Sequence, residues 1–69
     1  MPNKSKWYRI IDEINGDVCM NVEASSERAA LKRYMRGKLT SGIYEVVMED
    51  DKRPRLVSSY GSSFRADVV

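Results

Sequence analysis

Few residues in this chain have side chains that commonly catalyse reactions. The sequence contains no histidine, so the most frequent general base and metal ligand is missing. Its one cysteine, Cys19, lies in an apolar run between Val18 and Met20, away from any predicted helix N-terminus that would activate the thiol. We interpret Cys19 as a structural or surface thiol and predict that the protein is not an enzyme.

Adjacent acids are the other candidate for chemistry. Glu49, Asp50 and Asp51 offer oxygen ligands for a divalent cation, but the ligand spacing of an EF-hand is absent. Neighbouring acids in a turn are usually only solvated. The glycines are isolated, so the sequence has no phosphate-binding loop. We expect no metal, cofactor or small-molecule substrate.

Basic residues are concentrated in one predicted helix. Ser25 or Ser26 can cap it, Glu27 suits its first turn, and Gly37 is placed to end it. At about 100° per residue, one side is apolar, with Ala30, Leu31, Tyr34 and Met35. The other side is basic, with Arg28, Lys32, Arg33 and Arg36, and Lys38 just beyond. This side can neutralise phosphates without reading bases, although it is also typical of an ordinary solvated helix.

A hairpin before the helix assigns side chains to the two faces of a sheet. Asn15-Gly16 favours a two-residue type I′ turn. The predicted pairs are Glu13 with Val18, Ile11 with Met20, Arg9 with Val22, and Trp7 with Ala24. The side chains expected in the core are therefore Trp7, Ile11, Val18, Met20 and Val22.

The same register predicts an apolar strip rimmed by acids on the opposite face. Its apolar members are Tyr8, Ile10, Ile14, Cys19, Ile43 and Val47, and its acids include Asp12, Asp17, Glu23, Glu45 and Glu49. Negative charge there disfavours the stacking of RNA on a sheet and favours a protein partner. The residues predicted to bind this partner are Tyr8, Ile10, Ile14, Cys19, Ile43, Val47, Glu45 and Glu49. The alternative is that Phe64, Val68 and Val69 fold over the strip.

The remaining segments complete the fold. Residues 43–49 alternate as a strand, Pro54 ends a charged turn, and residues 55–60 form a weaker strand. Residues 64–69 are either a short edge strand or a disordered tail. The side chains of the third strand expected in the core are Tyr44, Val46 and Met48.

We therefore predict a small α+β domain of order ββαββ, with an optional short fifth strand at the C-terminus. One arrangement is an antiparallel four-stranded sheet of order 2-1-3-4 with the helix packed on one face. The other pairs the third strand with the second in parallel, which gives a mixed sheet.

Length and composition suit one small cytoplasmic domain. Residues 1–6 are expected to be a flexible N-terminus and residues 7–69 a single domain. No apolar run resembles a signal sequence or reaches the roughly 20 residues of a membrane span. The net charge of +2 does not by itself imply a polyanion partner.

Two functions follow from these surfaces. The first is protein binding through the acid-rimmed strip, including self-association as a homodimer, with a size typical of inhibitors or accessory factors of phages and mobile elements. The alternative is sequence-tolerant nucleic-acid binding through Arg28, Lys32, Arg33, Arg36 and Lys38.

Overall fold

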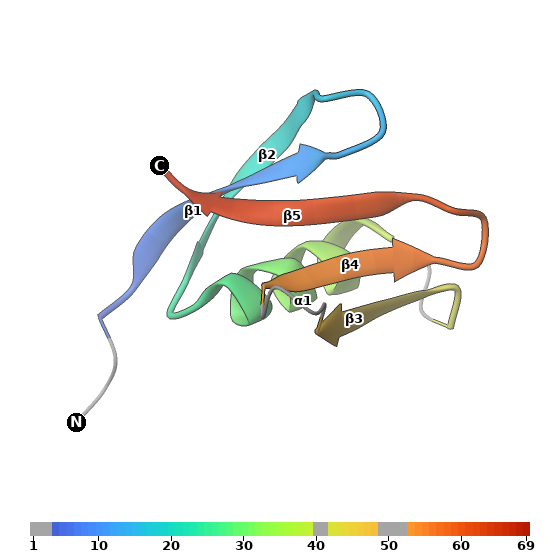
Figure 1. Cartoon of the computed structure of the whole chain (residues 1–69). Helices are drawn as coiled ribbons and strands as arrows, with labels where there is room; N and C mark the ends of the chain where they lie inside the picture. The colour runs from blue at the N-terminus through green and yellow to red at the C-terminus, as the bar shows by residue number, and fades with distance from the viewer. Residues whose placement is uncertain (1–3, 40–41, 49–52) are drawn as a thin grey trace.

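A single helix packs on one face of an antiparallel sheet in the computed structural model, which describes residues 4–39, 42–48 and 53–69 (Figure 1). The elements are β1 (Lys6–Asp12), β2 (Val18–Ala24), α1 (Glu27–Lys38), β3 (Tyr44–Met48), β4 (Pro54–Ser58) and β5 (Ser63–Val68). The predicted α+β class is therefore confirmed. No helix in the described ranges is both long and apolar enough to cross a membrane.

The strand order is β2-β1-β5-β4-β3, so both predicted arrangements are wrong. The C-terminal segment forms a central strand, not an edge strand or a tail. β5 pairs with β1 from Asp12↔Phe64 to Tyr8↔Val68, and with β4 at Leu56↔Phe64 and Val57↔Ser63. Phe64 and Ala66 are buried because the sheet flanks them on both sides and the helix covers them.

The β1–β2 hairpin has a longer loop than the two-residue turn predicted. The N–H of Asp12 donates to the carbonyl of Asp17 (2.9 Å), which leaves residues 13–16 in the loop. Asp12 Oδ1 also accepts from the N–H groups of Ile14 (2.9 Å) and Asn15 (3.3 Å). Gly16 supplies the left-handed conformation that this loop needs, with φ of 78°.

The longer loop shifts the pairing by one residue, and a one-residue shift turns a strand over. Tyr8 pairs with Val22, and the register is irregular between Ile10 and Ile11, opposite β2. β2 keeps its predicted orientation at Val22, which is buried, and at Met20, which packs against the core. Val18 is 54% exposed, so its predicted place in the core is wrong. β1 is reversed at Tyr8, which is in the core, and at Trp7, which is exposed. Ile11 is buried as predicted, but it lies outside the cluster beneath α1.

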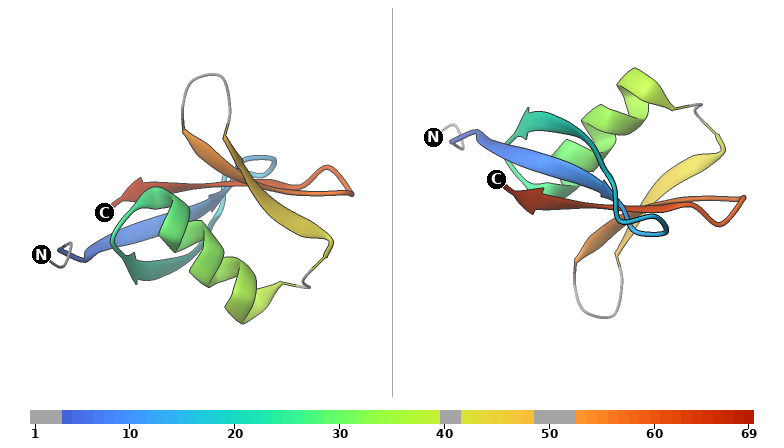
Figure 2. Two further views of the ribbon diagram at one scale, coloured as in Figure 1. Left: turned by 90° about the horizontal axis from the view of Figure 1, so that it is seen from below. Right: turned by 90° about the horizontal axis from the view of Figure 1, so that it is seen from above.

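The core lies between α1 and the sheet, whose other face carries no helix among the described residues (Figure 2). Ile10, Leu31 and Leu56 are its fully buried large side chains. Phe64 lies at its centre, with ring centroids 5.6 Å from Tyr34 and 6.3 Å from Tyr44. We call the opposite side of the sheet the helix-free face.

The helix begins as predicted and ends later. Ser26 is the N-cap, and its hydroxyl accepts from the N–H of Ala29 (3.1 Å). The helix continues through Gly37 to Lys38, and the N–H of Leu39 donates to the carbonyl of Met35. Gly37 is thus a helical residue and not the left-handed residue that follows the helix.

Candidate functional site

The outer side of α1 presents the cations that the sequence predicted. We call this set the basic face: Arg28, Lys32, Arg33, Arg36 and Lys38. Lys32 is half-buried and the other four are exposed. The helix points the first four outward because Ala30 and Leu31 are buried on its opposite side, and Lys38 is its last residue. Residues four apart rise about 6 Å along a helix, so Arg28, Lys32 and Arg36 form a row.

No acid in the described ranges forms an ion pair with the basic face. The one acid on α1 is Glu27 in its first turn, and its Oε1 lies 3.2 Å from Nε of Arg53. The positive charge of Arg36 and Lys38 is compatible with the negative end of the helix. The basic face therefore keeps its charge available to an external anion.

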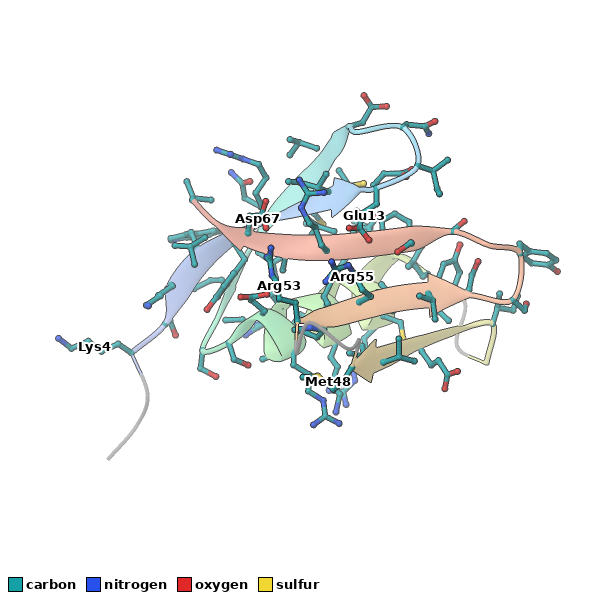
Figure 3. All side chains as sticks on the ribbon, viewed as in Figure 1. Lys4, Glu13, Met48, Arg53, Arg55 and Asp67 are labelled. Atoms are coloured by element: carbon teal, nitrogen blue, oxygen red, sulfur yellow. The ribbon has the colours of Figure 1, made fainter. Side chains whose placement is uncertain are left out.

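On the helix-free face Arg55 and Arg65 are paired with acids, whereas Arg9 is exposed and has no ion pair among the described residues. Glu13 Oε1 lies 3.0 Å from Nε of Arg55 and accepts from the hydroxyl of Ser63 at 2.7 Å. Glu13 Oε2 lies 3.7 Å from Nη1 of Arg65. These contacts join the hairpin loop to β4 and β5 (Figure 3).

A second set of pairs lies where β4 separates from β5. Arg53 Nη2 lies 2.7 Å from Asp67 Oδ1 and donates to the carbonyl of Ala66 at 3.2 Å. Asp67 Oδ2 lies 3.2 Å from Nε of Arg65. The hydrogen bond with Arg53 lowers the pKa of Asp67, and the same bond raises the pKa of Arg53. The guanidinium of Arg53 thus connects the start of β4 to β5 at a point where the two strands form no backbone pair.

The predicted partner-binding strip is not assembled, because the reversal of β1 removes its centre. Tyr8 is 4% exposed and Ile10 is 0% exposed, and both pack in the core beneath α1. Neither side chain can contact a partner in the folded protein. The prediction that placed them on an open face is therefore wrong.

The other predicted members of the strip are scattered. Ile14 is exposed in the hairpin loop, and Val47 is half-buried on β3. Ile43 and Glu45 line a groove of about 390 Å³ together with Val57. Glu49 lies outside the described residues.

Cys19 is a free, exposed thiol on the edge strand β2. Burial first, and then a side-chain hydrogen bond with Cys19, raises the pKa of Tyr34 in the helix to about 12. Tyr34 is therefore neutral at physiological pH.

Sequence reasoning missed the paired groups on the helix-free face. Arg65 and Asp67 alternate with the buried Phe64 and Ala66, which is the pattern of a strand with one polar face. That alternation was the available signal. The partners of these residues, Glu13 above all, are distant in sequence and carry no such signal.

No cluster suited to a metal ion occurs among the side chains that the structure describes. The basic face and the helix-free face are two surfaces that could bind a partner. Comparison with known proteins gave no matching family model, no similar curated protein and no similar solved structure.

Proposed function

We propose that this chain is a non-enzymatic binding module that contacts the backbone of a nucleic acid through the basic face of α1. The observation that carries the proposal is the separation of charge. The acids Glu13, Glu27 and Asp67 are paired with arginines in or directly before the strands β4 and β5, whereas the basic face has no described acid partner.

The chemistry of the basic face favours phosphates over bases. Arg28, Lys32 and Arg36 form a row about 6 Å apart, Arg33 flanks it, and Lys38 lies at the end of the helix. A protein that neutralises phosphates releases the counterions bound to them. If the four cations on this side of the helix make contact, doubling the salt from about 50 to about 100 mM should lower the affinity for a duplex about twelvefold.

The test is fluorescence anisotropy at low salt with a labelled duplex of arbitrary sequence. We expect the double variant Arg28→Glu with Lys32→Glu to weaken binding at least about tenfold, because it replaces two attractive charges with two repulsive ones. A second duplex of unrelated sequence should bind with similar affinity, since backbone contacts carry no sequence information.

A matched control separates the basic face from net charge. Lys4→Glu with Lys6→Glu changes the charge of the chain equally, at exposed positions before and at the start of β1. Figure 3 shows Lys4 away from the helix. We expect this pair to weaken binding only about twofold to threefold. Equal losses in the two double variants, or no binding at micromolar protein, would contradict the proposal.

A second candidate function is protein binding through the helix-free face, and one observation favours it. Trp7 is 54% exposed on that face, and tryptophan is enriched among residues that dominate protein interfaces. Its carbonyl accepts from the N–H of Val69, which is also exposed. A pull-down from the native host that recovers the same protein with wild type and with Trp7→Ala would exclude this role.

A further inference from the structure

The outer edge of β3 has no neighbouring strand in the described part of the chain. β3 ends the sheet and pairs only with β4. The three views agree that no drawn element lies beyond it (Figures 1 and 2). An edge strand of this kind is a template for pairing with another chain.

The hydrogen bonds of the β3–β4 pair identify the backbone groups at that edge. The N–H of Ser59 donates to the carbonyl of Ile43 at 3.0 Å. In an antiparallel pair, alternate residues point their N–H and C=O groups at the partner. Ile43, Glu45 and Val47 therefore bond to β4, and the residues between them point outward. The outward residues are Tyr44, Val46 and Met48.

The opposite residue on β4 agrees with this assignment. Met48 lies opposite Pro54, which has no N–H to donate. Met48 and Pro54 therefore form a pair that exchanges no backbone hydrogen bonds, and the N–H and C=O groups of Met48 point away from β4. No described group bonds to the outward N–H and C=O groups of β3.

The two edges of the sheet differ in their protection. β2, at the other edge, has an irregular register beside Ile10 and Ile11 and exposes Glu23. β3 pairs without a register shift and contains no proline, lysine or arginine. An irregular register and charged side chains are the usual means by which edge strands avoid association. Of these, β3 has one charged side chain, Glu45.

We propose that β3 pairs with β3 of a second copy of this chain, antiparallel and centred on Val46. In that register Val46 lies opposite its own copy and Tyr44 lies opposite Met48 of the copy. Each pair exchanges two N–H to C=O bonds. Every outward N–H and C=O group of β3 then bonds to the second copy. The side chains, which must also match, argue for a second copy as the occupant.

The side chains are compatible with the same register. Met48 is 59% exposed and would be covered by Tyr44 of the second copy, a contact in which sulfur meets an aromatic ring. The two Val46 side chains would extend the core across the axis, since Val46 already packs against it. Glu45 lies opposite Val47 of the copy, so no like charges face each other.

The dimer goes beyond the proposed nucleic-acid binding and does not depend on it. Two antiparallel strands keep their side chains in register only if the two-fold axis is perpendicular to the sheet. Both helices then lie on the same face of the doubled sheet. Both copies of the basic face would point to the same side.

Amide hydrogen exchange measured by NMR at several protein concentrations tests the proposal. We expect the amides of Tyr44, Val46 and Met48 to exchange more slowly as the concentration rises towards the millimolar range. Those of Glu45 and Val47 should be protected at every concentration, because they already bond to β4. Sedimentation equilibrium in the same samples should show a monomer and dimer in exchange.

Two variants and one control make the test specific. Met48→Lys places a charge at the edge, and Met48→Pro removes an outward N–H without removing a bond to β4. Both should sediment as monomers and keep the circular dichroism of the wild type. Val18→Lys, at a 54% exposed position on β2, should dimerise like the wild type.

Three outcomes would overturn the proposal. The first is a wild type that stays monomeric up to millimolar concentration. The second is a dimer that persists in both Met48 variants. The third is concentration-dependent protection that does not alternate along β3, which would indicate another contact surface.

Discussion

Oε1 of Glu13 lies 3.0 Å from Nε of Arg55, so a residue of the hairpin loop is tied to β4 across the intervening strand β5. The side chains of Glu13 and Arg55 are 23% and 16% exposed. We expect Glu13→Gln to lower the free energy of unfolding by about 1 to 2 kcal/mol, because Arg55 and Ser63 lose a charged acceptor. Urea denaturation followed by circular dichroism measures the change.

The control for this prediction lies in the same hairpin. Asp17→Asn removes the same charge at an exposed position, and its side chain has no hydrogen bond or ion pair among the described residues. We expect it to change the free energy of unfolding by less than about 0.5 kcal/mol. Equal effects of the two substitutions would show that the Glu13 contacts add no stability.

Because β1 is reversed, we expect substitutions at two of its residues to have opposite effects on the stability of the fold. Ile10 is fully buried, so Ile10→Glu places an unpaired charge in the core and should abolish cooperative thermal unfolding. Trp7→Glu changes an exposed side chain and should leave the fold intact. If Ile10→Glu folded normally while Trp7→Glu did not, the orientation of β1 described above would be incorrect.

Asp67 should make stability depend on pH in the acid range. Its pKa is lowered in the folded state from an ordinary value of 3.8, chiefly by the hydrogen bond with Arg53. Its contribution is therefore complete above that value and is lost as the pH falls through the lower folded value. Urea midpoints measured between neutral pH and the acid range should fall less steeply below about pH 4 in Asp67→Asn than in the wild type.

Tyr34 should ionise later than an ordinary tyrosine. Its pKa is raised to about 12, with burial as the main cause and the hydrogen bond with Cys19 as the second. Its stabilising contribution is complete below the ordinary value of 10.0 and declines as the pH rises towards 12. The near-ultraviolet absorbance of tyrosinate should show one of the four tyrosines titrating last.

Two substitutions identify that tyrosine and its surroundings. Tyr34→Phe should remove the late step from the titration. Cys19→Ala should keep most of the delay, because burial contributes more than the thiol does. A late step that is unchanged in Tyr34→Phe would assign it to another tyrosine.

The sequence predicted the local features of this fold well. The helix, its Ser26 cap and its basic face depend on residues within a few positions of one another, and the structure has them as expected. The alternation of β3 also placed Tyr44 and Val46 against the core correctly, but Met48, predicted with them, is 59% exposed. Such features are specified by neighbouring residues, so a pattern can reveal them.

Two features depended on contacts that no local pattern records. Asn15-Gly16 favours a two-residue turn, but Asp12 bonds to the N–H groups of Ile14 and Asn15 and stabilises a longer loop. The longer loop goes with a register one residue away from the predicted one, and in this register the predicted partner strip does not form. The central position of β5 likewise depends on pairing between residues such as Tyr8 and Val68, which are far apart in the chain.

The position of β5 also has a consequence for biosynthesis. The β1–β2 hairpin and the β3–β4 hairpin meet in the sheet only through β5, which is translated after both. While residues 63–68 are still inside the ribosomal exit tunnel, neither hairpin has its neighbour and the sheet cannot close. The native domain therefore forms only after these residues have emerged from the tunnel.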